Sequence, residues 1–183
     1  MVWSCLVSIL PGMAQTEKLT DYVNPFVSTD GYGNVYPGAQ IPFGGIQISP
    51  DTDSRFYDAA SGYKYNHLTL MGFSLTHLSG TGIPDLGDFL FIPGTGEMKL
   101  EPGTHEDPDQ GYRSRYSHDK EWASPNYYAV ELADYGVKAE MTSGVRSGMF
   151  RFTYPESDNA FIMIDMNHTL WQSCEWSNLR MIN

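Results

Sequence analysis

Basic residues are scarce in this sequence. Lys and Arg together number 11 against 22 Asp and Glu, and the formal net charge of the 183 residues is −11. Proteins that bind nucleic acid or anionic membranes present a basic patch, and none is visible here. We therefore expect no nucleic-acid partner. A neutral polyhydroxylic ligand or a cation suits the charge better, although an acidic surface also serves solubility alone.

Cysteines and long hydrophobic runs are equally scarce. Cys5 and Cys174 are the only two cysteines, too few for a disulfide framework. Residues 2–14 are apolar but too short to span a bilayer, which takes about 20 residues. Gly12 and Ala14 are small residues two apart, so we expect residues 1–14 to be a signal peptide cleaved near Ala14. The expected location is exported, in the periplasm, at the cell surface or outside the cell, with no membrane span.

The sequence also lacks a recognisable metal motif. The five histidines are scattered without ligand spacing, and there is no Cys-x-x-Cys. Asp51 and Asp53 resemble the start of an EF-hand loop, but the sixth position is Phe56 and the twelfth is Gly62. We interpret the two aspartates as turn-forming residues whose short side chains bond the local backbone. No metal ligand is predicted in this chain.

Catalytic motifs are missing as well. His77, Ser79 and Asp85 could imitate a Ser-His-Asp triad, but such triads are assembled from separate elements and no Gly-x-Ser-x-Gly elbow is present. Asp85 and Asp88 are spaced like turn or rim residues rather than like an acid and base pair. The sequence therefore predicts no catalytic residue.

Alternation of apolar and polar residues dominates the second half of the chain. Tyr128, Val130 and Leu132 share one face of a predicted strand, and after a turn at 134–136 the alternation resumes over 137–142. Residues 150–154 alternate again, and the nearly continuous apolar run Phe161–Met166 is typical of a central strand. These patterns predict an all-β, antiparallel β-sandwich over residues 15–169. Residues 170–183 show no alternation and are expected to be an incomplete C-terminal segment.

The stretch from Gly62 to Asp88 contains a loop rich in Gly, Ser and Thr between apolar strands. Polar groups packed between buried strands are costly unless they bind something. We therefore expect this loop to contact a ligand or another domain.

Long segments of the sequence resemble one enzyme family. They are DYVNPFVSTDGYGNVYPGAQIPFGGIQISPDT, SGYKYNHLTLMGFSLTHLSGTGIPDLGDFLFIP and YRSRYSHDKEWASPNYYAVELADYGVKAEMTSGVRSGMFRFTYP, which begin at Asp21, Ser61 and Tyr112. These segments resemble the N-terminal domain of glycoside hydrolase family 92, the exo-acting, calcium-dependent α-mannosidases. The resemblance runs from about Asp21 to Asn167. One departure is the loop after Thr29, which reads Asp-Gly-Tyr-Gly-Asn where the family carries a histidine.

The resemblance implies a fold, an activity and a set of contacts. The family joins an N-terminal β-sandwich to a helical (α/α)6 barrel, absent here, that holds the general acid and base and most contacts to calcium. The reaction removes terminal α-mannose from glycans with inversion, most commonly from α-1,2 linkages. By this resemblance the chain contributes loops to the substrate cleft and docks on its own barrel domain. The implied substrate-binding residues are Thr76, His77, Ser79, Asp85, Tyr32, Asn34 and, by stacking on the sugar, Tyr57.

A second hypothesis stays open at this point. The chain could be a stand-alone carbohydrate-binding β-sandwich module that recognises mannose-containing glycans through its aromatic residues and loop polar groups without cleaving them. A purely structural sandwich is a third, weaker reading.

Overall fold

The computed structural model describes residues 17–54 and 59–182. The predicted signal peptide and the predicted stacking residue Tyr57 lie outside the described residues. Among the described residues, none of the helical segments has the length and apolar character that a membrane crossing demands.

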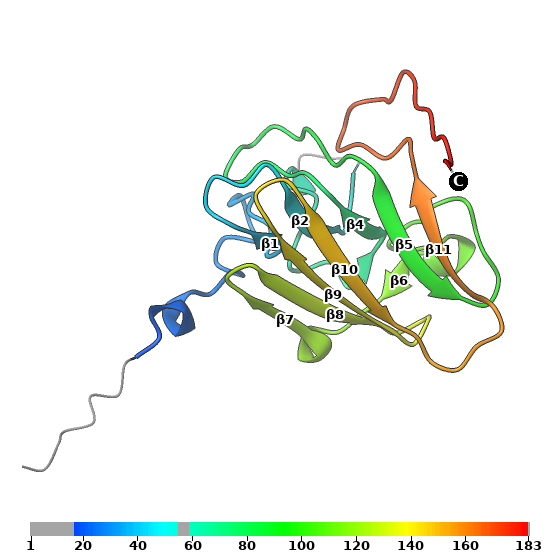
Figure 1. Ribbon diagram of the computed structural model, residues 1–183, viewed down its shortest axis with the longest axis horizontal. Coiled ribbons are helices and arrows are strands. Elements are labelled where there is room, and N and C mark those ends of the chain that lie inside the picture. The colour runs from blue at the N-terminus through cyan, green and yellow to red at the C-terminus, as the bar shows by residue number, and fades with distance from the viewer. Residues whose placement is uncertain (1–16, 55–58, 183) are drawn as a thin grey trace, which may run out of the picture.

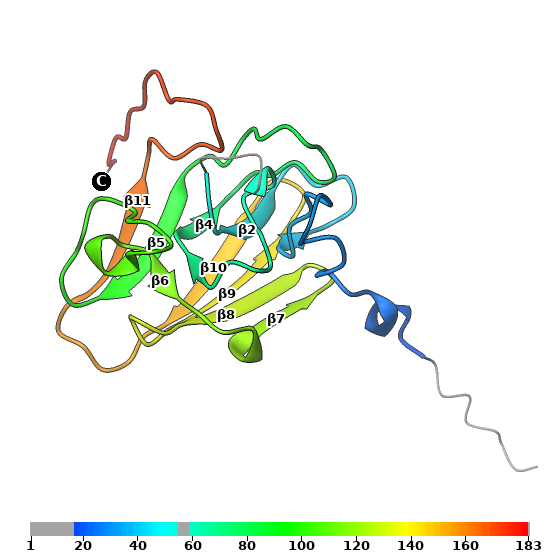
Figure 2. The same ribbon diagram turned by 180° about the vertical axis from the view of Figure 1, so that it is seen from behind.

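Two antiparallel sheets form the body of the protein (Figures 1 and 2). The first has five strands in the order β1-β2-β4-β5-β11, and the second has four in the order β10-β9-β8-β7. The bounds of the first sheet are β1 (Ala39–Gln40), β2 (Gln47–Asp51), β4 (Gly72–Ser74), β5 (Leu90–Thr95) and β11 (Ala160–Asp165). Those of the second are β7 (Glu121–Ser124), β8 (Tyr127–Leu132), β9 (Val137–Ser143) and β10 (Gly148–Thr153). The predicted all-β, antiparallel β-sandwich is confirmed.

Smaller elements complete the described chain. A two-stranded ribbon pairs β3 (Thr69–Leu70) with β6 (Ser114–Arg115). The helical residues are short 3-10 turns, η1 (Leu19–Tyr22), η3 (Pro108–Gln110) and η4 (His118–Lys120).

The main core lies between the two sheets because each sheet turns its apolar face inward. From the first sheet, Ile48 and Phe73 are fully buried. From the second, the residues that alternate in the sequence are buried as predicted: Tyr128, Val130, Leu132, Val137, Ala139 and Met141. Strands β8 and β9 pair as the expected hairpin, with Leu132 opposite Val137.

A buried carboxylate fixes the start of β7. The Glu121 side chain is fully buried and accepts hydrogen bonds from the hydroxyls of Tyr63 at 3.0 Å and Tyr128 at 2.5 Å. His118 Nδ1 lies 2.6 Å from its other oxygen. Burial, reinforced by the charge of Glu121, raises the pKa of Tyr128 well above its ordinary value, so this phenol remains a donor.

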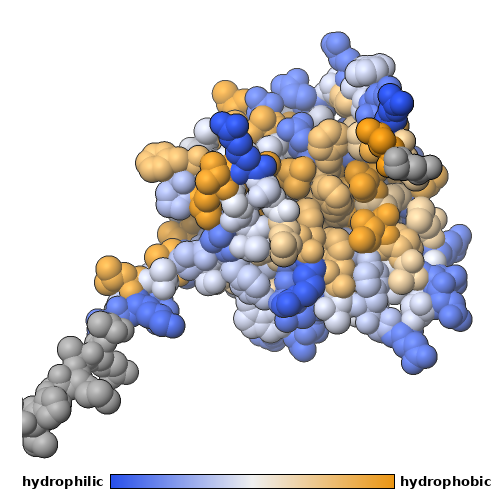
Figure 3. Space-filling view, viewed as in Figure 1, coloured by the Kyte–Doolittle hydropathy of each residue, from blue (hydrophilic) through white to orange (hydrophobic). Residues whose placement is uncertain are grey.

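The prediction of a central strand at Phe161–Met166 is wrong. Strand β11 lies at the edge of the five-stranded sheet and pairs with β5 alone. Its apolar residues occupy both faces, and Ile162 and Ile164 on one face are 53% and 40% exposed. Figure 3 shows apolar side chains gathered where Figure 1 places β5, β10 and β11. In this structure the apolar run at residues 161–166 thus belongs to an edge strand, β11, whose face with Ile162 and Ile164 is partly exposed.

Candidate functional site

Asp51 is the centre of a buried polar cluster. It is the last residue of β2, its side chain has no exposed surface, and its two oxygens face two histidines. Oδ1 lies 2.8 Å from Nε2 of His77, and Oδ2 lies 2.7 Å from Nε2 of His168. The interpretation of Asp51 as a turn-forming residue is therefore wrong. The side chain points into the sandwich, and its partners come from distant segments.

His77 is surrounded by acceptors on both sides of its ring. Nδ1 lies 2.6 Å from the carbonyl oxygen of Gln47, which can only accept a hydrogen bond. Nε2 faces the Asp51 carboxylate and also lies 3.0 Å from the Ser74 hydroxyl. A ring that donates from both nitrogens satisfies this arrangement, and such a ring is the imidazolium form. His77 and Asp51 thus form a buried ion pair.

The charge state of Asp51 follows from these neighbours. Burial works against ionisation, but the charge of His77, the hydrogen bonds from His168 and His77, and the charge of His168 outweigh it and hold the pKa of Asp51 below its ordinary range. Asp51 is therefore a carboxylate that accepts on both oxygens.

His168 connects this cluster to an open cavity. Its side chain is only 4% exposed, and Nε2 is held by Asp51. Since a carboxylate accepts, Nε2 of His168 donates the hydrogen bond to Asp51. Nδ1 has no hydrogen-bond partner among the described residues.

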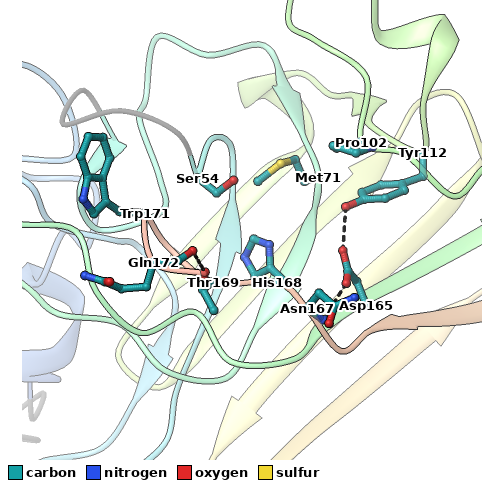
Figure 4. A pocket seen from close by; sticks show the side chains of 10 residues that line it. All are labelled: Ser54, Met71, Pro102, Tyr112, Asp165, Asn167, His168, Thr169, Trp171 and Gln172. Carbon is teal, nitrogen blue, oxygen red and sulfur yellow. Dashed lines mark hydrogen bonds between the residues drawn. The ribbon is translucent and has the colours of Figure 1, made fainter. Parts of the chain in front are cut away.

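The cavity beside His168 has a volume of about 450 Å³. Figure 4 shows His168 between Trp171 and Gln172 on one side and Asp165 and Asn167 on the other. The Tyr112 hydroxyl donates to Asp165 Oδ2 at 3.3 Å, and the backbone N–H of Asn167 donates to Oδ1 at 2.9 Å. Ser54, Met71, Pro102, Tyr112 and Thr169 complete the lining. The walls thus combine an indole, a carboxylate, amides and hydroxyls.

The wall after β11 is held in place by a buried leucine. Leu170 is fully buried, and its backbone N–H donates to the carbonyl of Leu86 at 2.8 Å. A Cβ on Gly87 would come within 2.7 Å of the Leu170 side chain, so the two segments pack in close contact. The next residue, Trp171, has a positive φ of 76° and donates its backbone N–H to the carbonyl of Ser54 at 2.9 Å. Bulky residues rarely adopt this conformation, and such strain concentrates at functional sites.

The predicted substrate-binding residues that the structure describes are not among the residues that line this cavity, but two of their loops contact each other. The loop with Tyr32 and Asn34 contacts the loop that follows Ser79, because the backbone N–H of Gly80 donates to the Asn34 carbonyl at 2.7 Å. Tyr32 and Ser79 are exposed, and Asn34 is half-buried. The structure therefore brings two distant predicted loops together.

The remaining predicted residues, Asp85, Thr76 and His77, differ in how far their side chains are buried. Asp85 is exposed and accepts a hydrogen bond from the backbone N–H of Leu86 at 2.8 Å. The Thr76 hydroxyl donates to Asp88 Oδ2 at 2.8 Å. His77 is buried, and its route to the cavity runs through Asp51 and His168. Their role as substrate contacts remains a prediction.

The sequence reading missed the residues that line the cavity. His168, Asp165, Asn167 and Trp171 fall in a stretch with little alternation, and no motif connects them to Asp51. An available signal was the density of polar and aromatic types in Asn-His-Thr-Leu-Trp, which a plain linker does not require. Among the described residues, no group of three or more His, Cys, Asp or Glu side chains is arranged to hold a metal ion.

Comparison with known proteins places the chain in a family. A sequence profile of the glycosyl hydrolase family 92 N-terminal domain matches residues 22–183. The chain belongs to glycoside hydrolase family 92. The match covers every described β-strand and the whole cavity, so the site is part of the family 92 domain.

Solved structures of family 92 enzymes share this fold. A family 92 α-mannosidase from Bacteroides thetaiotaomicron is 99% identical and superposes with a TM-score of 0.90, over 91% of this chain and 22% of that one. An inverting family 92 mannosidase from the same species is 26% identical, with a TM-score of 0.65 over 82% of this chain and 20% of its own.

A curated relative comes from the fungus Arthroderma benhamiae. It is described as an uncharacterized secreted glycosidase and is 29% identical over 139 residues, which is 75% of this chain and 17% of the relative. The chain thus spans about a fifth of the length of the family 92 proteins that it matches.

Proposed function

We propose that this chain is the N-terminal domain of an exo-acting α-mannosidase that removes terminal α-mannose from glycans with inversion. In this role the domain contributes loops to the substrate cleft and docks on a helical barrel domain that carries the general acid and base. The proposal is supported by the family match and by the 99% identical family 92 α-mannosidase. Inversion is supported by the relative described as an inverting mannosidase.

The observation that carries the proposal is the backbone hydrogen bond that connects the cavity wall to one of the predicted loops. The segment from His168 to Trp171 forms one wall of the cavity and is bonded to Leu86 in the loop that carries Asp85. That loop in turn contacts the Tyr32–Asn34 loop through Gly80. One end of the sandwich therefore gathers an indole, hydroxyls, amides and carboxylates, the groups that bind apolar sugar faces and sugar hydroxyls.

We propose that calcium is bound by the barrel domain and not by this chain. The described residues hold no cluster with the several oxygen ligands that calcium takes, and we assign no step in this chain to the metal. When bound, the ion would supply Lewis-acid stabilisation within the barrel. The residues described here would bind and orient the glycan.

Export is the remaining part of the proposal. It is supported by the apolar character of residues 2–14 and by a relative described as secreted. N-terminal sequencing of the protein recovered from the medium or the periplasm tests it, and a chain that still begins at Met1 would contradict it.

The activity is tested with two proteins. The longer polypeptide, with this chain followed by a barrel domain, is incubated with α-1,2-linked mannobiose with and without a calcium chelator, and NMR follows the anomer released. We expect β-mannose as the first product and loss of activity with chelator. The 183-residue chain is assayed beside it. Mannose release by this chain alone would contradict the assignment of the catalytic carboxylates to the barrel.

A stand-alone binding module is the second candidate. It is favoured by one observation, that an indole, amides and hydroxyls lie together on the walls of the cavity in this chain. The module predicts glycan binding without any hydrolysis by the longer polypeptide. Measured mannose release excludes it.

A further inference from the structure

We propose that a further β-strand, contributed by the polypeptide that follows this chain in the longer protein, pairs with the free edge of β10 and covers the exposed face of β11. The added strand would widen the second sheet of the sandwich. The inference rests on the proposed function only in taking this chain as one part of a longer polypeptide.

The exposed isoleucines of β11 lie on the same side of the first sheet as the main core. Phe73 in β4 pairs with Phe91 in β5, and Phe91 pairs with Ile164 in β11. Directly paired residues of neighbouring strands project from the same face of a sheet, and so does Ile162, two residues from Ile164. Phe73 is fully buried in the main core. The exposed face of β11 is therefore a continuation of the surface that faces the second sheet.

The second sheet is too narrow to cover this surface. In the described part of the chain the first sheet has five strands and the second has four. The rings of Phe91 and Phe150, the latter in β10, have their centroids 4.9 Å apart, so the last strand of the second sheet reaches as far as β5. Along the row from β4 to β11, Phe73 is buried, Phe91 is half-buried and Ile164 is exposed. The apolar area beside β10 in Figure 3 is the part of the first sheet that the second sheet leaves uncovered.

Strand β10 has a free edge without the features that block strand pairing. Among the described residues it pairs with β9 alone, in a continuous register without a bulge. Natural edge strands are protected by Lys, by Pro or by bulges. The six residues Gly148–Thr153 include no Lys or Pro, and their one charged residue is Arg151. The Arg151 guanidinium donates to Glu140 of β9, from Nε at 2.8 Å and from Nη2 at 2.6 Å, so it is turned away from the free edge.

An extended strand fits both the edge and the face. Its backbone groups would pair with those on the free edge of β10, and every second side chain would point toward Phe91, Ile162 and Ile164. These three side chains offer no hydrogen-bond donor or acceptor, so a carbohydrate is a poor occupant of this surface. An apolar side chain packed between the sheets suits them, because burial of apolar surface is favourable.

The same polypeptide is the nearest source of such a strand. Figures 1 and 2 place the C-terminal end of the chain near the tip of β11, on the side of the molecule where the uncovered surface lies. The 99% identical α-mannosidase is much longer, since this chain covers 22% of it. A segment that follows residue 183 would therefore start close to the edge of β10.

Hydrogen–deuterium exchange, followed by mass spectrometry, tests the pairing. It compares peptides that contain β10 in the 183-residue chain and in the longer polypeptide with its barrel domain. We expect exchange of the β10 amides to be at least about tenfold slower in the longer polypeptide, because a paired strand supplies acceptors to the free edge. Peptides from β8, which is paired on both sides in this chain, are the control and should change less. Equal exchange of β10 in the two proteins would overturn the inference.

Cysteine labelling tests whether the face of β11 is covered. Ile162→Cys is made in both proteins and labelled with a maleimide, and the labelled peptide is identified by mass spectrometry so that Cys174 does not interfere. We expect labelling of Ile162→Cys to be at least about tenfold slower in the longer polypeptide, since reaction requires access. Val23→Cys is the matched control, because Val23 is also 53% exposed but lies at the end of η1. A rate for Ile162→Cys that falls no more than the rate for Val23→Cys would overturn the inference.

The two measurements also identify other occupants. Protection of β10 in the 183-residue chain that grows with protein concentration would assign the edge to a second copy. Slow labelling at position 162 without protection of the β10 amides would assign the cover to a structure other than a strand. Either result would overturn the inference.

These results are separable from the proposed function. If the longer polypeptide releases mannose while β10 and position 162 are unprotected in it, the inference fails and the function stands. If it releases no mannose but both are protected, the inference stands and the function fails.

Discussion

Replacing Asp51 by asparagine should destabilise the fold severely. The change keeps the size of the side chain but removes the charge between two buried histidines, and it offers one acceptor oxygen where two are used. Whichever way the amide is turned, its NH₂ group faces an imidazole N–H. The partners lose a hydrogen bond, and the charge of His77 is left without its counterion inside the core.

The magnitude follows from the burial. Asp51 and His77 have no exposed side-chain surface, so water cannot replace the missing partner. Breaking one side of a buried ion pair costs about 3–5 kcal/mol. With a urea dependence of roughly 2 kcal/mol per molar, the midpoint of unfolding should fall by about 1.5–2.5 M. The matched control is Asp85→Asn, an exposed aspartate that keeps its bond from the backbone N–H of Leu86, and it should change stability by less than about 0.5 kcal/mol.

The pH dependence gives the same prediction a second check. Because the pKa of Asp51 is lowered on folding, its contribution is fully present above its unfolded pKa of about 3.9 and is lost as the pH falls through the folded value. The gap between the wild type and Asp51→Asn should therefore shrink below about pH 4. Urea unfolding of both variants between pH 3 and pH 7, followed by tryptophan fluorescence, measures it. A loss no larger than that of Asp85→Asn at neutral pH would refute the buried ion pair.

Three further predictions concern other parts of the fold. Glu121→Gln should lower the free energy of unfolding by about 2–4 kcal/mol in urea titrations, because a fully buried acceptor of several hydrogen bonds loses its charge; a change as small as that of an exposed glutamate would contradict it. Gly62→Ala should lower the melting temperature by several degrees, since Gly62 has a φ of +83° and an added Cβ would lie 2.0 Å from Oδ1 of Asp51; an unchanged melting temperature would argue against this contact. Ile162→Lys, on the uncovered face of β11, should leave stability within about 0.5 kcal/mol and reduce self-association in analytical ultracentrifugation; unchanged sedimentation at high concentration would show that this face does not attract a second copy.

Local patterns predicted much of the sandwich. Strands β8 and β9 were predictable because their residues alternate and a glycine-containing turn joins them, so that all the information lies within some twenty residues. The run at 161–166 misled, because an apolar residue on each face of a strand is compatible with burial or with an uncovered edge. Sequence alone does not say which strand lies beside it.

The site was harder to predict because its contacts are long-range. His77 is 26 residues from Asp51, and His168 is 117 residues from it. No spacing rule applies to such pairs, and the short side chain of Asp51 suggested a turn. The resemblance to family 92 singled out loops that the structure brings into contact, and their role in binding stays a prediction. The cavity depends on the backbone path of residues 166–172, where no periodic pattern exists.

The long separation between Asp51 and His168 also sets an order of events during synthesis. A ribosome adds roughly 5 to 20 residues per second, so His168 is made about 6 to 23 seconds after Asp51. Until that residue has been made, Oδ2 of Asp51 lacks the partner that it has in the folded domain. The segment that carries His168, the partner of Oδ2, also forms one wall of the cavity. The cavity is therefore among the last parts of the domain to form, because one of its walls is built from residues 165–172.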